Sequence, residues 1–170
     1  MKTAVLIDGS NTYMAMRNLY EIDWNAFRRY HNKHYPMVQL LYYTAVHTVE
    51  GHSDIRPLVD WLDFNGYRVI QKPTKTFNNS ENGLKKIKGD MDVEIAVDMV
   101  RLSRKMDHII LYSGDGDYVP AVRAAQDEGC YITVVSAMSV AADELRRACN
   151  SFIDIAELQG VLCRGKTSTP

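Results

Sequence analysis

Short apolar runs alternate with longer amphipathic stretches along the chain, and this alternation predicts strands separated by helices. Five runs have the length and composition of buried strands: Ala4–Ile7, Met37–Thr44, Tyr67–Gln71, His108–Tyr112 and Tyr131–Ser136. A shorter run, Phe152–Ile155, suits either an added strand or an extended segment. Because continuous apolar runs are typical of parallel strands covered on both faces, we expect an α/β fold with a parallel sheet.

The stretches between these runs carry capping residues and apolar positions at helical spacing. Six of them are expected to be helical: about Thr12–Tyr20, Trp24–His34, Ser53–Asn65, Gly89–Met106, Val119–Glu128 and Ser139–Asn150. Asp23 and Ser53 are suited to cap the starts of two of these helices. Gly66 and Gly129 follow two expected helix ends, a place where glycine is favoured.

The stretch Lys72–Ile87 breaks the alternation, because it combines proline, glycine and asparagine with several lysines. It follows the third predicted strand, so it starts at the carboxyl edge of the sheet. A loop of this length inside a compact domain is uncommon. Two interpretations stay open: a cationic flap over an anionic substrate, or a disordered surface insertion.

Length and composition narrow the class of protein. A chain of 170 residues favours one domain, expected over residues 1–160, with a flexible polar tail over residues 161–170. The net charge of −1 means that any nucleic-acid footprint has to be local. Three cysteines without CxxC spacing disfavour a zinc site or a disulfide framework and fit a reducing compartment. No apolar stretch suits a signal peptide or a membrane span, so we expect a cytoplasmic protein with no membrane partner.

Acidic residues follow two of the predicted strands. Asp8 comes directly after the first, and Asp115 and Asp117 lie in a glycine-rich turn after the fourth. Right-handed crossovers with one change of winding direction place these two strands side by side. Asp92 begins the helix that leads to the fourth strand, so it is expected at the same edge, together with the amide of Asn11. Taken one at a time, each acid has an ordinary role as a helix cap or turn residue. Together they suit Mg²⁺ or Mn²⁺, because hard divalent cations prefer oxygen ligands.

Four motifs occur in order along the chain. They are Val5–Asn11 (VLIDGSN), Lys88–Val93 (KGDMDV) with Asp98 further on, Ser113–Pro120 (SGDGDYVP), and Glu144–Ala148 (ELRRA) with Phe152–Asp154 behind it. Together they resemble the NYN domain, and more narrowly the LabA-like branch of the PIN-like nuclease superfamily. The resemblance extends over about residues 3–158.

This resemblance implies a three-layer α/β/α Rossmann-like sandwich with a parallel sheet of about five strands in the order 3-2-1-4-5. It also implies a metal-dependent ribonuclease that uses Mg²⁺ or Mn²⁺ to hydrolyse RNA. The acidic metal site of the family falls on Asp8, Asp92, Asp115 and Asp117, with Asn11 as a polar helper in catalysis. The residues expected to contact the RNA substrate are Asn11, Ser113, Lys85, Lys86 and Lys88.

Two positions depart from the family pattern. Asp90 stands where many relatives have an apolar residue, which leaves open whether Asp90 or Asp92 is the ligand. We prefer Asp92 because its spacing to Asp98 fits the family, while the role of Asp98 itself stays open. Asn150 stands where an acid is expected in many relatives.

Other functions are weighed against the nuclease. An RNA-binding or regulatory NYN module with little turnover fits the near-neutral charge, since one fold hosts many functions. A phosphohydrolase with Asp8 as nucleophile is disfavoured, because Ser10 stands where such enzymes need a second aspartate. A dinucleotide-binding protein is disfavoured by the lack of a GxGxxG motif after the first strand. The oligomeric state stays open, a homodimer included.

Overall fold

The computed structural model describes residues 1–16, 21–46, 55–78, 85–88 and 90–164. At its centre lies a six-stranded sheet with the strand order β4-β3-β1-β7-β8-β9, in which all neighbours are parallel. The strands are β1 (Lys2–Asp8), β3 (Met37–Val46), β4 (Arg68–Pro73), β7 (His108–Tyr112), β8 (Tyr131–Ser136) and β9 (Ser151–Asp154). The predicted order 3-2-1-4-5 is therefore confirmed, and the run at Phe152 adds a sixth strand to it.

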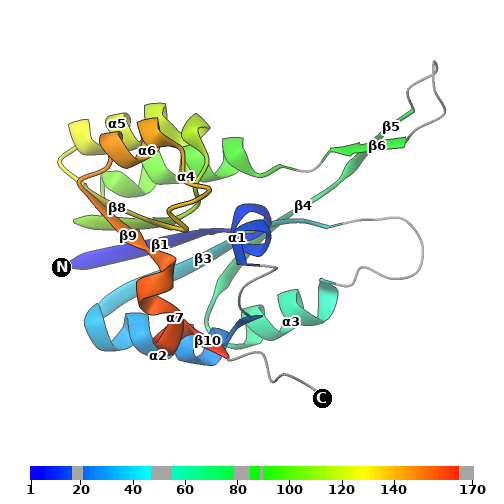
Figure 1. Ribbon diagram of the computed structural model, residues 1–170, viewed down its shortest axis with the longest axis horizontal. Helices are drawn as coiled ribbons and strands as arrows, with labels where there is room; N and C mark the ends of the chain where they lie inside the picture. Colours follow the sequence, from blue (N-terminus) through cyan, green and yellow to red (C-terminus); the bar gives the residue numbers. More distant parts are fainter. Residues whose placement is uncertain (17–20, 47–54, 79–84, 89, 165–170) are drawn as a thin grey trace.

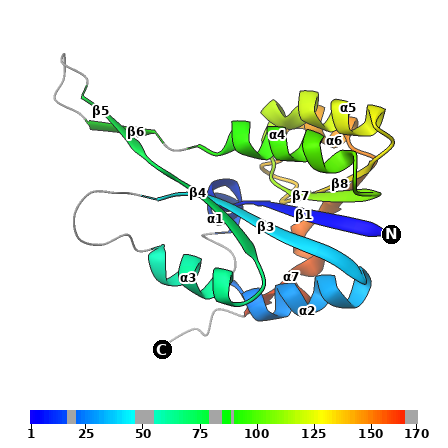
Figure 2. The same ribbon diagram turned by 180° about the vertical axis from the view of Figure 1, so that it is seen from behind.

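Helices cover both faces of this sheet, which confirms the three-layer sandwich (Figures 1 and 2). One face carries α4 (Asp92–Ser103), α5 (Val119–Asp127) and α6 (Asp143–Ala148). The other carries α2 (Trp24–His34), α3 (Arg56–Phe64) and α7 (Gln159–Leu162), while α1 (Gly9–Met16) follows the carboxyl end of β1.

The alternation of side chains along β1 divides the interior into two cores. Ala4 and Leu6 pack into the core under α4, α5 and α6. Val5 and Ile7 point the other way, into the core that contains Phe27 of α2. Because β1 is buried on both faces, its sequence is apolar at every position between Ala4 and Ile7.

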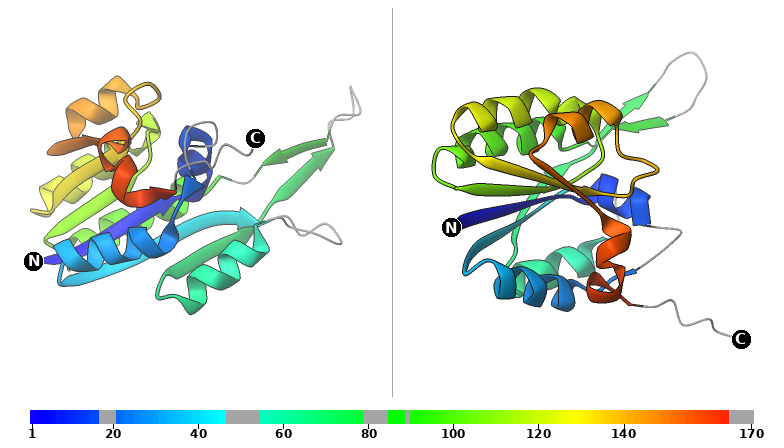
Figure 3. Two further views of the ribbon diagram at one scale, coloured as in Figure 1. Left: turned by 60° about the horizontal axis from the view of Figure 1, so that its bottom comes forward. Right: turned by 60° about the vertical axis from the view of Figure 1, so that its left-hand side comes forward.

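The segment expected as a long loop contains a hairpin instead. β5 (Lys75–Asn78) pairs antiparallel with β6 (Lys85–Lys88), whereas the sequence predicted no strand between residues 72 and 87. The hairpin continues outward from β4 and extends beyond the sandwich in every view (Figures 1–3). Residues 79–84 lie outside the described residues. The prediction failed because these two strands pair with each other and carry few apolar residues, so they lack the pattern of a buried strand.

Several helix boundaries also differ from prediction. α1 starts at Gly9, and α6 covers Asp143–Ala148 only. α3 starts at Arg56 with a proline in its first turn, and the expected cap Ser53 lies outside the described residues. Gly66 and Gly129 have φ angles of 83° and 84°, the left-handed conformation expected after a helix end.

Structure also continues past the expected end of the domain at residue 160. A 3₁₀ turn (η2, Ile155–Leu158) leads into α7, and β10 (Cys163–Arg164) then pairs antiparallel with β2 (Glu21–Ile22). Residues 165–170 of the expected tail lie outside the described residues. Within the part of the chain that is described, no helix has the length and apolar character to cross a membrane.

Candidate functional site

The ends of β1 and β7 meet at the centre of the sheet. Ile7 pairs with Tyr112, so Asp8 and Ser113 leave the two strands side by side. Asp8 is 5% exposed, and a buried carboxylate needs hydrogen bonds to offset the loss of water. Its Oδ1 accepts from the backbone N–H of Asn11 at 3.0 Å, and its Oδ2 accepts from the Ser113 hydroxyl at 3.1 Å. The carboxylate of Asp8 is thus held in one orientation.

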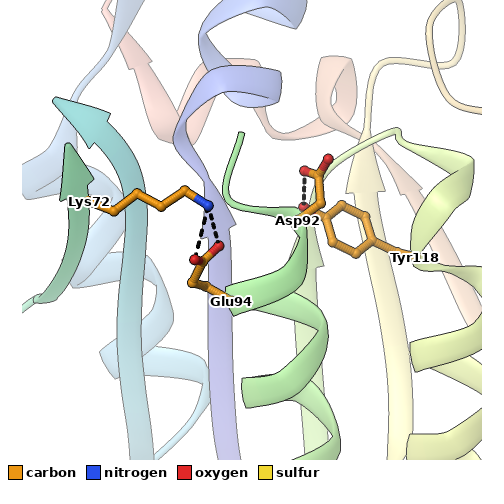
Figure 4. A network of polar contacts seen from close by, with 4 residues as sticks. All are labelled: Lys72, Asp92, Glu94 and Tyr118. Carbon is orange, nitrogen blue, oxygen red and sulfur yellow. Dashed lines mark hydrogen bonds and ion pairs between the residues drawn. The ribbon is translucent and has the colours of Figure 1, made fainter. Parts of the chain in front are cut away.

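Tyr118 joins Asp8 to a second acid. Its hydroxyl lies 3.2 Å from Oδ2 of Asp8 and 3.0 Å from Oδ1 of Asp92, the first residue of α4 (Figure 4). A hydroxyl has one proton, so it donates to one of the two carboxylates at a time. The tyrosine is 1% exposed and lies in a 3₁₀ turn (η1, Gly116–Tyr118) directly after the acidic loop. Three segments far apart in the sequence therefore converge on this one phenol.

The site carries excess negative charge. Burial raises the pKa of Asp8, hydrogen bonds from Asn11, Ser113 and Tyr118 oppose that rise, and the charge of Asp115 adds to it. Burial likewise raises the pKa of Asp92; the Tyr118 hydrogen bond opposes the rise, and the charges of Asp8, Asp90 and Asp115 add to it.

The negative charge of the site also affects the pKa of Tyr118. Burial first, and then the charges of Asp8 and Asp92, raise the pKa of Tyr118 far above its ordinary value. The phenol therefore stays protonated and acts as a donor at any ordinary pH.

Asp115 and Asp117 occupy different positions in the turn. Asp115 caps η1: its Oδ1 accepts from the backbone N–H of Asp117 at 2.9 Å, and its own N–H donates to the Ser113 hydroxyl at 3.3 Å. Its charge reaches both Asp8 and Asp92. Asp117 is exposed, and within the described residues its carboxylate makes no hydrogen bond to the other acids. The structure thus groups Asp8, Asp92 and Asp115 more closely than Asp117.

Asn11 ties the loop after β1 to the loop after β7. Its side-chain oxygen accepts from the N–H of Gly114 at 2.9 Å. Gly9 also has no room for a side chain, because a Cβ there would lie 2.6 Å from the carbonyl oxygen of Tyr43. These close approaches hold the two loops of the site against the sheet.

The structure shows the surroundings of two acids and one amide whose roles the sequence left open. Asp98 accepts from the Tyr43 hydroxyl at 3.0 Å and pairs with Arg101 at 2.9 Å, so it anchors α4 to β3. Asp90 precedes α4, is exposed, and acts on Asp92 through its charge. Asn150 directly precedes β9, and its side-chain oxygen accepts from the N–H of Ile132 near the start of β8, whereas the acids lie at the carboxyl ends of the strands.

Two further residues belong to the site although no role was predicted for them. Tyr118 is one, and it stands inside the SGDGDYVP motif. Glu144 of α6 is the other: a Cβ built on Gly116 would lie 2.5 Å from Oε1 of Glu144, so this carboxylate lies against the acidic turn. Both belong to motifs that resemble the family, but spacing alone did not indicate which way their side chains point.

The predicted lysines Lys85, Lys86 and Lys88 lie on β6 of the hairpin, which follows β4 beyond the carboxyl edge. Their side chains are not among the parts described. Nearer the acids, Lys72 of β4 pairs at 2.8 Å with Glu94 of α4, which lies two residues after Asp92 (Figure 4).

The donor set can be tested for its fit to a metal ion. Within the described residues, no three His, Cys, Asp or Glu side chains already lie close enough together to hold one. The groups at the site are all oxygen donors, and none of the charges that shift the pKa of Asp8 or Asp92 is a cation. This chemistry fits a hard divalent cation, which would relieve the repulsion between the acids.

Comparisons with known proteins agree with this architecture. The family model described as the NYN domain matches residues 2–157. The chain is 31% identical over 173 residues to the low amplitude and bright protein LabA of Synechococcus elongatus, covering 99% of this chain and 90% of that protein. It is also similar to the crystal structure of a protein of unknown function from Vibrio parahaemolyticus, with a TM-score of 0.73, 25% identity, and coverage of 89% of this chain and 91% of that one. The match to the family model over nearly its whole length shows that the chain belongs to the NYN domain family.

Proposed function

We propose that the protein is a divalent-metal-dependent ribonuclease and that it hydrolyses RNA phosphodiester bonds at Asp8, Asp92 and Asp115. One observation carries this proposal: Asp8 and Asp92, which are 84 residues apart in the sequence, meet on the Tyr118 hydroxyl while Asp115 adds its charge to both. Membership of the NYN domain family, which resembles the PIN-like nucleases, supports the same reaction.

Asp8, Asp92 and Asp115 are the residues that would hold Mg²⁺ or Mn²⁺. The bound cation would supply an acidified water and charge neutralisation at the phosphate. Asp117, on the exposed turn, is proposed to hold a second ion or to orient the attacking water. The chain's own contribution is to fix the acids: Ser113 and the Asn11 backbone orient Asp8, and Tyr118 holds it next to Asp92.

Substrate contacts are proposed for the polar groups around the acids. Asn11 and Ser113 lie in the two loops that flank Asp8, and we propose that they contact the RNA strand. Lys85, Lys86 and Lys88 lie on the projecting hairpin, where cationic side chains would neutralise phosphates beyond the cleavage position.

The test is cleavage of a labelled single-stranded RNA by the pure protein with Mn²⁺, with EDTA, and with Asp115→Asn. Loss of outer-shell partners already costs about 10–100-fold in metal sites, so we expect Asp115→Asn to lower the rate by more than about 100-fold. Asp60→Asn, on the exposed surface of α3 in the opposite layer, is the matched control and should cleave like wild type. A wild-type protein that cuts no RNA with Mn²⁺, or an Asp115→Asn variant that cuts equally well, would falsify the proposal.

A second candidate is an RNA-binding module with little turnover. It is favoured by the internal hydrogen bonds of Asp8, whose two oxygens already accept from Asn11, Ser113 and Tyr118. In that case RNA should be retained in filter binding without cleavage, and Asp8→Ala should leave retention unchanged. Cleavage that depends on Asp8 excludes this candidate.

A further inference from the structure

A cationic pocket lies between α4 and β4, at the opposite edge of the sheet from the acids. Its volume is about 230 Å³, and four cations line it together with one carboxylate: Arg68, Arg101, Arg104, Lys105 and Asp98. Leu41 and Leu102 form part of its apolar wall. The pocket is separate from the site built by Asp8 and Asp92, since none of its lining residues contacts those acids.

The charges around this pocket do not balance. Asp98 is neutralised by Arg101 at 2.9 Å, and Arg104 lies 3.4 Å from Glu128. Among the described residues, Arg68 and Lys105 have no ion-pair partner. Two positive charges are therefore left over around a cavity large enough for a phosphate group.

The helix end alone does not account for this cluster. Cations at the last turn of a helix are favourable because the helix dipole is negative there, which explains arginine and lysine at the end of α4. Arg68 comes from β4, a different element, and its charge acts on Tyr43 in the same region as that of Arg101. Cations from a strand and from a helix end therefore line the same pocket.

The pocket and the acidic site are joined by the same two elements. Asp92 and Arg101 are nine residues apart on α4, which corresponds to roughly 13.5 Å along the helix at about 1.5 Å per residue. On β4, Arg68 and Lys72 point to the same face, because side chains alternate along a strand. Lys72 reaches α4 beside Asp92 through its pair with Glu94, so α4 and β4 run together from one site to the other.

We propose that this pocket binds a phosphodiester group of a single-stranded RNA whose further length reaches the acidic site. The proposal rests on the proposed function for its choice of ligand. A stacked strand carries one phosphate per about 3.4 Å, so the two sites are roughly four nucleotides apart. Arg68 and Lys105 supply the contacts, and they need no metal ion to do so.

The experiment measures RNA binding in EDTA, where the acidic site holds no cation and cannot cleave. A labelled single-stranded oligonucleotide of about twelve nucleotides is titrated into wild type, the double variant Arg68→Ala/Lys105→Ala, and Arg29→Ala at several salt concentrations. Each phosphate contact contributes about 0.7 to the slope of log K against log salt for single strands. We expect the slope of the double variant to be smaller by about 0.7–1.4, and that of Arg29→Ala, which changes an exposed arginine of α2 in the other layer, to equal the wild-type value.

A second measurement tests the path between the two sites. With Mn²⁺, the KM of wild type should fall as the substrate grows from about three to about eight nucleotides, and the double variant should lose this dependence on length. Circular dichroism and the unfolding midpoint verify that the variant is folded.

An unchanged salt slope in the double variant, or no binding by wild type in EDTA, overturns the pocket proposal and leaves the cleavage test untouched. Binding in EDTA without cleavage in Mn²⁺ would instead retain the pocket and remove the proposed reaction.

Discussion

At the scale of single residues, the Tyr118 hydroxyl is the contact on which the acidic site depends. It is buried, stays protonated, and lies within hydrogen-bonding distance of two carboxylates that repel each other, donating to one of them at a time. Sequence reasoning placed Asp8 and Asp115 after strand ends and Asp92 at a helix start at the same edge of the sheet, but it assigned no role to this phenol. The direction of a side chain in a 3₁₀ turn depends on packing, which spacing along the chain does not reveal.

We expect Tyr118→Phe to lower the free energy of unfolding in EDTA by about 1.5–3 kcal/mol, the range for hydrogen bonds to charged groups. The control is Tyr131→Phe, whose hydroxyl makes a longer, exposed bond of 3.4 Å to Asn150 and should change stability by less than about 0.5 kcal/mol. Urea unfolding measures both. Equal stability of Tyr118→Phe and wild type would show that the hydroxyl does not hold the acids together.

The raised pKa values of Asp8 and Asp92 predict a pH dependence of stability. A carboxyl group whose pKa is higher in the folded state binds more protons there, so the folded state is favoured at low pH and that advantage is lost as pH rises through the raised pKa. We therefore expect Asp8→Asn to flatten the metal-free stability profile between its ordinary pKa of 3.8 and neutrality. Unfolding in EDTA across this range is the measurement, and a steeper profile in the variant would contradict it.

The same carboxylates predict a coupling of metal binding to pH. Mn²⁺ at 100 times its dissociation constant should stabilise the folded protein by about 2.7 kcal/mol. This gain should shrink as the pH falls, because protons compete for Asp8 and Asp92. Thermal unfolding with and without Mn²⁺ measures it, and an equal gain in Asp8→Asn would remove Asp8 from the metal site.

At the scale of elements, the junction between β1 and α1 positions the site. Gly9 follows Asp8 directly, and a Cβ there would meet backbone and ring atoms of β3 at 2.6–2.9 Å. The helix therefore begins at once after the strand, with Asn11 in its first turn. Helix α1 therefore starts at Gly9, earlier than the start at about Thr12 that the sequence predicts.

We expect Gly9→Ala to destabilise the fold by about 1–3 kcal/mol, because backbone atoms have to move to accept the methyl group. Gly160→Ala in α7 is a matched control with nothing within 4 Å of the added carbon. It should be neutral or stabilising, since alanine favours helix over glycine. If the urea midpoints of the two variants coincide, the tight contact at Gly9 has no energetic weight.

Elements differed in how well the sequence predicted them, for a physical reason. His108–Tyr112 and Tyr131–Ser136 were predicted to the residue, because strands buried on both faces need continuous apolar side chains. The hairpin of β5 and β6 was missed, since two strands that pair mainly with each other need no apolar pattern. The start of α6 was placed too early because residues 139–142 share its polar and apolar character but form a turn.

At the scale of the whole molecule, the C-terminal segment closes the core under α2. Leu162 is 1% exposed, and its carbonyl accepts from the N–H of Asp23, the cap of α2. We expect Leu162→Ala to cost about 2–5 kcal/mol, as for other buried leucines. Its neighbour Val161 is 49% exposed, so Val161→Ala should cost far less. Chemical unfolding compares the two, and equal losses would place the domain end before α7.

The topology also determines when in its synthesis the chain acquires its site. Asp8 leaves the ribosome early, yet its neighbours Ser113 and Tyr118 arrive more than a hundred residues later. A nascent polypeptide that stops short of β7 carries lone carboxylates and no assembled pocket of charge. The contacts that orient Asp8 therefore form only after β7 and η1 have been synthesised.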